Sequence, residues 1–99
     1  MPDGGVVLAA DTGLISRGNA SVRLTRKEFD VVQTLWAARP RVLSRVQMME
    51  RLYDVEADEP DWNIVAVFIS RLRPRLAEIG VKIVTHWGRG WSIEVEARP

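Results

Sequence analysis

The chain has 99 residues, of which 46% are apolar and 27% charged, with a formal net charge of +1 at pH 7. This length suits one small domain, and the apolar share, which includes four tryptophans, excludes an intrinsically disordered chain. Cysteine is absent, which excludes disulfide bonds and thiolate metal sites, and no apolar run approaches the roughly twenty residues of a membrane helix. Because the N-terminus also lacks an export signal, we expect a cytoplasmic protein without membrane contact.

The N-terminal part alternates short apolar runs with turn-forming segments. Residues 6–24 contain the turn formers Asp11-Thr12-Gly13 and Arg17-Gly18-Asn19. This pattern predicts a small antiparallel sheet of two or three strands. We interpret the sheet as scaffold, because strands with these turns rarely carry chemistry.

Two capping boxes predict where two helices begin. Thr25-x-x-Glu28 begins the first helix, which ends before Pro40 because a residue that precedes proline is pushed out of the helical region. Ser44-x-x-Gln47 begins the second helix. Helical spacing assigns to the buried sides of these helices Phe29, Val32, Leu35 and Trp36, and then Val46, Met49 and Leu52. The neighbouring methionines, Met48 and Met49, are interpreted as core filling rather than as ligands.

An acidic run separates the second helix from the third. It holds five of the thirteen acidic residues and no basic one, which leaves eight acids against fourteen bases in the rest of the sequence. That basic remainder suits a polyanionic partner. For the run itself, composition favours a solvated loop, with a protein-contact surface as the alternative. Its acidic residues are Asp54, Glu56, Asp58, Glu59 and Asp61.

Residues 61–78 are predicted to form a third helix with one apolar and one polar face. The apolar stripe consists of Val65, Phe68, Ile69, Leu72 and Leu76. The polar side carries Arg71, and neither Arg71 nor Arg73 has a carboxylate at the spacing of a helical ion pair. Arginine offers a fixed charge and a planar fork of donors, which phosphates and guanine edges accept. We therefore interpret this element as a DNA recognition helix rather than as a solvated surface helix.

The C-terminal part predicts a hairpin. Residues 82–86 and 91–95 alternate as two strands, and Gly88-Arg89-Gly90 supplies the turn between them. Gly80 is placed to close the third helix in a left-handed conformation.

Four side chains of the hairpin receive different interpretations. Arg89 at the tip suits a narrow minor groove, with a freely moving surface charge as the alternative. Trp91 is assigned to the core, whereas Trp87 either packs on the domain or stacks at the sugar-phosphate edge of a duplex. His86 has no metal-ligating neighbours at ligand spacing, so we expect no metal there.

The sequence gives no support to an enzyme. It contains no Ser/His/Asp arrangement, no glycine-rich phosphate loop between a strand and a helix, and no cluster of metal ligands. We expect no catalytic residue, no metal site and no cofactor.

Four blocks of the sequence resemble the successive signatures of the OmpR/PhoB winged helix-turn-helix, the DNA-binding half of many bacterial response regulators. They are Leu24-Thr25-x-x-Glu28-Phe29, Leu43-Ser44-Arg45, Val65-x-Val67-Phe68-Ile69-Ser70-Arg71-Leu72-Arg73 and Gly88-x-Gly90-Trp91. The blocks occur in order over residues 6–95, with residues 1–5 and 96–99 as tails. Three segments are similar to a cell-cycle regulator of this family: Asp58-Glu59-Pro60, Val67-Phe68-Ile69 and Trp87-Gly88-Arg89-Gly90.

This resemblance implies an α+β fold and a way of binding double-stranded DNA. The third helix would enter the major groove and the hairpin, the wing, would reach the adjacent minor groove. Arg71 matches the base-reading position, with help expected from Asn63 and Ser70, and Thr85 matches a wing residue that touches the backbone. Phosphate contacts are expected from Arg73, Arg75, Arg89 and either Lys27 or Arg45.

The resemblance also implies partners. Family members bind direct repeats head to tail, so we expect a monomer or weak dimer that pairs on DNA. In the family the loop between the second and third helices contacts RNA polymerase, and residues 53–61 occupy that place.

Three departures from the family pattern change these expectations. Pro74 replaces a basic residue, and inside a helix it deletes the hydrogen bond to the Ser70 carbonyl, at a cost of about 3 kcal/mol or a kink. Ala66 replaces an acid, which makes the helix more basic. No receiver domain precedes the winged helix in this sequence, so we expect no switching by the chain's own phosphorylation. Because of Pro74 and the missing receiver, an alternative function is an interaction protein that binds RNA polymerase or a full-length regulator of the family and modulates or competes with it.

Overall fold

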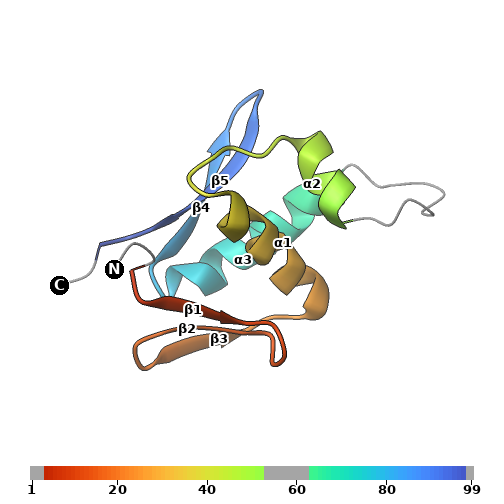
Figure 1. Cartoon of the computed structure of the whole chain (residues 1–99). Coiled ribbons are helices and arrows are strands. Elements are labelled where there is room, and N and C mark those ends of the chain that lie inside the picture. The colour runs from red at the N-terminus through yellow and green to blue at the C-terminus, as the bar shows by residue number, and fades with distance from the viewer. Residues whose placement is uncertain (1–3, 53–62, 98–99) are drawn as a thin grey trace.

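The computed structural model describes residues 4–52 and 63–97, so the acidic run predicted as a protein-contact loop lies outside the described residues. The described part contains three helices and two small antiparallel sheets, which confirms the predicted α+β winged helix fold (Figure 1). The elements in order are β1 (Val6–Ala9), β2 (Leu14–Arg17), β3 (Ala20–Arg23), α1 (Arg26–Ala38), α2 (Arg45–Leu52), α3 (Ile64–Ala77), β4 (Val81–His86) and β5 (Gly90–Val95).

The N-terminal strands form a three-stranded sheet in the order β1-β2-β3. Ile15 pairs with Leu8 on one side and with Val22 on the other. Both Ile15 and Val22 are buried, because alternate residues of a strand point to the same face and this face lies on the core. The sheet therefore closes the core at the end of the molecule opposite the wing tip (Figure 1).

Both predicted capping boxes are present. The Thr25 hydroxyl accepts a hydrogen bond from the Glu28 amide at 3.3 Å, and the Glu28 carboxylate accepts one from the Thr25 amide at 2.9 Å. Ser44 and Gln47 make the same reciprocal pair at 3.1 and 2.9 Å. Each pair satisfies amides that would otherwise lack partners at the start of a helix.

The inner face of α2 differs from the prediction at one position. Val46 is 52% exposed, whereas Met48 and Met49 are buried and Leu52 is half-buried. Two residues advance a helix by about 200°, so Val46 and Met48 cannot both face the core. The core takes the larger side chain, and the methionines fill it as predicted.

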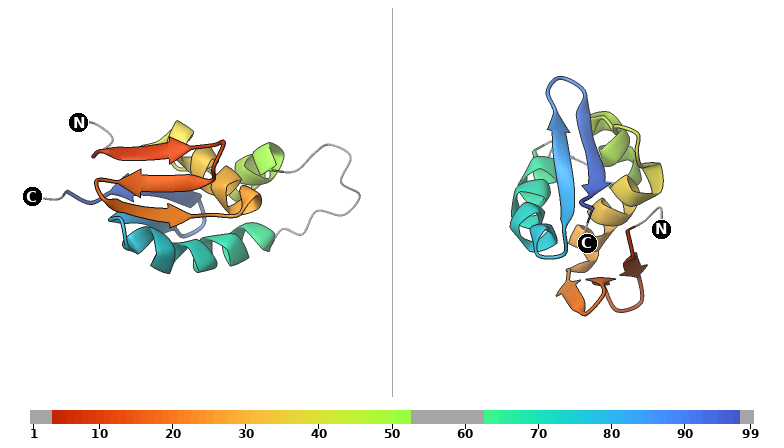
Figure 2. Two further views of the ribbon diagram at one scale, coloured as in Figure 1. Left: turned by 90° about the horizontal axis from the view of Figure 1, so that it is seen from below. Right: turned by 90° about the vertical axis from the view of Figure 1, so that its left-hand side faces the viewer.

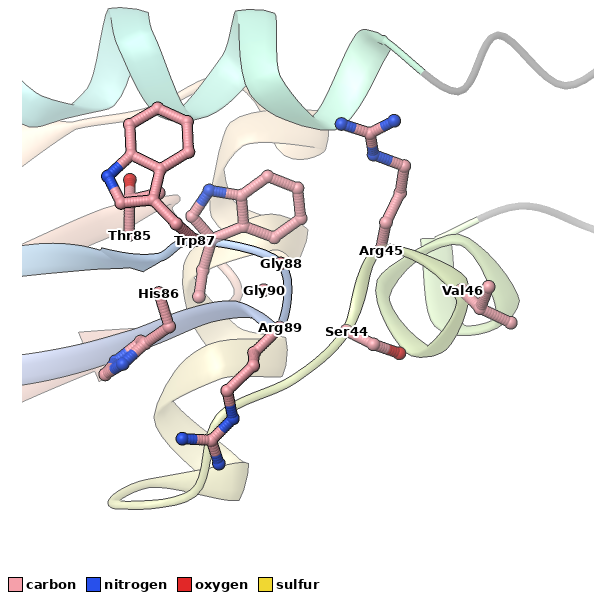
Figure 3. A pocket seen from close by; sticks show the side chains of 10 residues that line it. Ser44, Arg45, Val46, Thr85, His86, Trp87, Gly88, Arg89 and Gly90 are labelled. Atoms are coloured by element: carbon pink, nitrogen blue, oxygen red, sulfur yellow. The ribbon is translucent and has the colours of Figure 1, made fainter.

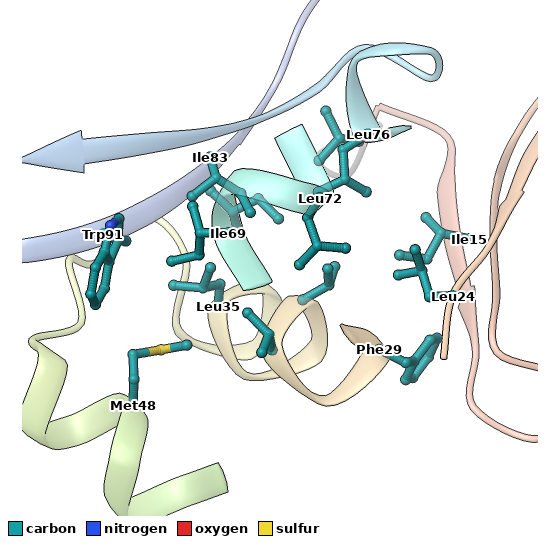
Figure 4. Packing of buried hydrophobic residues seen from close by; sticks show 14 of the residues in the cluster. Ile15, Leu24, Phe29, Leu35, Met48, Ile69, Leu72, Leu76, Ile83 and Trp91 are labelled. Atoms are coloured by element: carbon teal, nitrogen blue, oxygen red, sulfur yellow. The ribbon is translucent and has the colours of Figure 1, made fainter. Parts of the chain in front are cut away.

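The predicted apolar stripe of α3 is buried, except for Phe68, which is only half-buried and packs at the margin of the core. Figure 4 shows Ile69 and Leu72 between the first helix and the hairpin, with Trp91 at one side of the same cluster. The helix continues through Pro74, and Leu76 beyond it is fully buried. The proline therefore leaves the last turn docked on the core.

The wing consists of β4 and β5, paired from Val81 with Val95 to His86 with Gly90. It is attached on two sides: α3 lies along one side and α1 with α2 along the other (Figure 2). On the second side Leu43 and Trp91 exchange backbone hydrogen bonds of 2.7 and 2.9 Å. Gly80 precedes the wing and adopts the predicted left-handed conformation, with a φ of +69°. Its amide donates to the Ala77 carbonyl at 3.1 Å.

Within residues 4–52 and 63–97, no helix is both long and apolar enough to cross a lipid bilayer.

Candidate nucleic-acid interface

The outward face of α3 carries the residue predicted to read bases. Arg71 and Ser70 are exposed, and the Arg71 guanidinium has no hydrogen-bond or ion-pair partner among the described residues. Asn63 is exposed and stands at the N-cap of α3, where its side chain makes no capping hydrogen bond. A rigid helix therefore presents Arg71 to the solvent, with its inward neighbour Leu72 fixed in the core.

The polar side of α3 is less free of partners than the sequence predicts. Arg73 donates from Nε to the Ile83 carbonyl at 3.3 Å and from Nη2 to the Thr85 hydroxyl. Both acceptors belong to β4, so this guanidinium links the third helix to the wing. Spacing within one helix does not reveal these partners, because they are a carbonyl and a hydroxyl on another element.

Arg75 also has partners, and they come from the N-terminal half of the chain. It forms an ion pair with Glu28 at 3.1 Å and donates a second hydrogen bond to the Arg23 carbonyl. The Glu28 side chain is only 9% exposed. Burial raises the pKa of Glu28, but hydrogen bonds from Thr25 and the positive charge of Arg75 outweigh burial, and the pKa lies below its usual value.

The wing tip presents an aromatic and a basic side chain to the solvent. Trp87 is 91% exposed, so it does not pack on the domain as one of its two interpretations required. Arg89 is exposed and its guanidinium has no partner in the described part of the chain. Trp91, by contrast, is 7% exposed and belongs to the core, as predicted.

A surface pocket of about 390 Å³ lies between the start of α2 and the wing (Figure 3). Residues 44–46 line one side and residues 85–91 the other. In Figure 3 the Arg45 side chain extends from α2 toward α3. The His86 Nε2 lies 2.8 Å from the Ser92 hydroxyl, and the described residues contain no group of side chains that could hold a metal. The side chains that line the pocket include the basic Arg45 and Arg89 and the aromatic Trp87 and Trp91.

The structure thus brings together Arg45, Thr85, Trp87 and Arg89 around the pocket (Figure 3). Arg71 does not line the pocket and lies on α3. The sequence interpretation placed Val46 in the core and so missed its place in the pocket wall. The signal that could have found it is the opposition of Val46 and Met48 around the helix axis.

A family model described as "Transcriptional regulatory protein, C terminal" matches residues 18–93. The chain belongs to this family. It is an OmpR/PhoB-type winged helix domain, the class that forms the DNA-binding effector part of response regulators, and the sequence resemblance is confirmed.

Relatives of known name support the assignment. The cell cycle transcriptional regulator CtrA of Caulobacter vibrioides is 32% identical over 93 residues, which are 91% of this chain and 40% of CtrA. This chain thus spans about 40% of the length of the CtrA relatives that it matches.

Solved structures agree on the fold. The C-terminal domain of the nisin resistance regulator NsrR superimposes with a TM-score of 0.78 at 28% identity, over 90% of each chain. The Klebsiella pneumoniae RstA DNA-binding domain, solved in complex with the RstA box, superimposes with a TM-score of 0.74 over 93% of each chain. At 24% identity the RstA match shows the common fold alone.

Proposed function

We propose that this OmpR/PhoB-type domain binds specific double-stranded DNA and regulates transcription in the bacterial cytoplasm. In this proposal α3 enters the major groove and the wing reaches the adjacent minor groove. The observation that carries it is the exposed Arg71, which has no partner among the described residues. It stands on a helix that lies along the wing, and the wing tip, which is also exposed, projects beyond that helix (Figure 2). A guanidinium held out in this way matches the acceptor pattern of a guanine edge.

The proposed contacts divide into those that read sequence and those that hold the backbone. Arg71 reads a base edge, with Ser70 and Asn63 beside it. Backbone and minor-groove contacts come from the exposed basic and aromatic side chains around the pocket and from the remaining donors of the α3 arginines. This set consists of Arg45, Arg73, Arg75, Thr85, Trp87 and Arg89, with Lys27 as the alternative to Arg45.

Arg75 is the weakest member of this set. Its guanidinium already donates hydrogen bonds to Glu28 and to the Arg23 carbonyl, so a phosphate would compete with these two acceptors. Arg73 and Arg75 each keep three of the five N–H groups of a guanidinium. The partners of Arg73 are neutral, whereas the charge of Arg75 is already offset by the Glu28 carboxylate. We therefore expect Arg73 to contribute more than Arg75 to phosphate binding.

We further propose that two copies bind direct-repeat sites head to tail and that the chain is a monomer or weak dimer off DNA. Residues 53–61 are the proposed surface for RNA polymerase.

Selection of bound sequences from a random duplex pool tests the proposal. The expected result is one enriched motif, repeated in the same orientation, that the protein shifts in a gel at concentrations where scrambled duplex stays free. If no sequence is enriched and no duplex is shifted at low salt, the proposal fails.

The second candidate is an interaction protein that acts on RNA polymerase or on a related response regulator. The observation in its favour is that two of the three α3 arginines, Arg73 and Arg75, are engaged inside the domain. Capture of purified RNA polymerase or of a purified family regulator, unchanged by the Arg71→Ala and Arg73→Ala substitutions and with no DNA shift at low salt, would favour it.

A further inference from the structure

One side chain of the recognition helix makes hydrogen bonds to the wing in addition to the core packing between them. Arg73 leaves α3 and reaches two acceptors on β4, the Ile83 carbonyl and the Thr85 hydroxyl. Ile83 is buried, whereas Thr85 lies where β4 leaves the core toward the tip. The Arg73 guanidinium therefore bridges the step from Ile83, which packs in the core, to Thr85, where core packing of β4 ends.

We infer that Arg73 is a positioning residue that fixes the wing relative to the recognition helix and so couples the minor-groove contact to the major-groove contact. This inference rests on the proposed DNA-binding function. It goes beyond a phosphate contact by Arg73, because it states that the free energy of the minor-groove contact by the wing depends on the link between Arg73 and β4.

The physical reason is preorganisation. Beyond Thr85 the hairpin carries Trp87 and Arg89, both exposed. A tip that moves freely must be ordered when it meets a groove, and that ordering opposes binding. On the β5 side the wing is already fixed by the Leu43 and Trp91 hydrogen bonds, so Arg73 supplies the matching attachment on the β4 side.

Arginine suits this role better than lysine. Its planar fork places Nε and Nη2 at a fixed separation, so that two acceptors on one strand hold it in a single orientation. An ammonium group on a flexible stem would bind one acceptor or the other without setting the angle of the strand.

A double-mutant cycle on the selected DNA site tests the inference, with variants Arg73→Ala, Arg89→Ala and the pair. In the unmodified chain we expect Arg89→Ala to weaken binding about tenfold, whereas in the Arg73→Ala background it should weaken binding less than about twofold. The matched control is the cycle of Arg71→Ala with Arg89→Ala, in which the losses should multiply because Arg71 makes no hydrogen bond or ion pair to the described residues of the wing.

Independent losses in the Arg73 cycle would show that Arg73 only binds phosphate, and would overturn the inference while leaving DNA binding intact. An Arg89→Ala variant that binds as well as the unmodified chain would also overturn it, because no tip contact would exist to be coupled. If the unmodified chain binds no DNA, the proposed function itself fails.

Two checks separate positioning from misfolding. If Arg73→Ala fails to fold, Arg73→Gln removes the charge and the fork while keeping the aliphatic stem, and the cycle is repeated with it. Nuclear spin relaxation of the Trp87 indole N–H should report faster motion in the Arg73 variants than in Arg71→Ala. Equal motion in both would count against the inference.

Discussion

Arg71 and Arg75 lie about one turn apart on α3, but their surroundings differ in kind. Arg71 has solvent around it and no partner among the described residues, whereas Arg75 is held by a carboxylate from α1 and a carbonyl from β3. A guanidinium without internal partners keeps its donors for a ligand, and one with partners mainly supports the fold. The two side chains therefore lead to separate predictions.

Replacing Arg71 with alanine should weaken binding to the selected DNA site by about 1 to 3 kcal/mol, because a bidentate contact to a base edge is lost. Binding to scrambled duplex should change less. Gel-shift titrations on both duplexes measure the difference. The control is Arg26→Ala, which removes the same charge from an exposed site beside the β1–β2 turn. An equal loss on both duplexes would assign Arg71 to phosphate instead.

Replacing Glu28 with glutamine should lower the free energy of unfolding at pH 7 by about 1 kcal/mol or less, because Arg75 is 40% exposed and its ion pair is screened by solvent. Glutamine keeps the capping box, so the loss reports the charge. The folded-state pKa of Glu28 is lowered, so its contribution is fully present above the unfolded-state pKa and disappears as the pH falls through the folded-state value.

Urea unfolding at pH 7 and at successively lower pH measures this contribution. The stability difference between the unmodified chain and Glu28→Gln should shrink as the solution is acidified. Glu50→Gln, an exposed glutamate on α2, should leave stability unchanged at every pH. A difference that stays constant down to pH 2 would mean that the charge of Glu28 has no role.

At the scale of elements, the wing depends on a close approach of two backbones. A Cβ built on Gly90 would lie 1.9 Å from the Leu43 carbonyl oxygen, and the Gly90 φ is +138°. Any side chain there must separate β5 from the segment that precedes α2. The glycine is therefore required by contact as well as by conformation.

Gly90→Ala should consequently destabilise the domain by more than Gly88→Ala. Gly88 also has a positive φ, but no atom lies within 4 Å of its added Cβ, so alanine there should cost about 1 to 2 kcal/mol of backbone strain. Thermal unfolding of the two variants compares them directly. Equal melting temperatures would show that the backbone around Leu43 can move away from a Cβ at position 90 without a loss of stability.

At the scale of the whole molecule, the N-terminal sheet and the base of the wing are tied together by Arg17. Its guanidinium donates to the carbonyls of Gly4, Ile79 and Glu96 at 2.9, 3.2 and 2.6 Å. These three carbonyls precede β1, follow α3 and follow β5. One side chain thus gathers distant parts of the chain at the end of the molecule away from the wing tip.

The proposed DNA face at the other end should make binding strongly dependent on salt, because each phosphate neutralised by a basic side chain releases counterions. Arg45→Ala and Arg89→Ala should each reduce the slope of log affinity against log salt by about 1. Titrations between low and physiological salt measure the slopes, with Arg26→Ala as the control that leaves the slope unchanged. A slope unaffected by both substitutions would remove these arginines from the interface.

The amino-acid sequence was enough to predict the helices, their capping boxes, the hairpin and the buried stripe of α3. These features depend on periodicity and on residues three or four positions apart, so the pattern contains the information that specifies them. Because the family signature is also local, the sequence was enough to predict the winged helix fold.

Only the tertiary structure shows which basic side chains keep their donors for a ligand and which are bonded inside the domain. Arg75 meets Glu28 from 47 residues away, and Arg73 meets Thr85 across 12 residues. It also decided that Gly90 closely approaches Leu43. These contacts join elements that are far apart in the sequence and become neighbours only when the core packs. The spacing of residues along the chain therefore does not predict which side chains or backbone atoms meet.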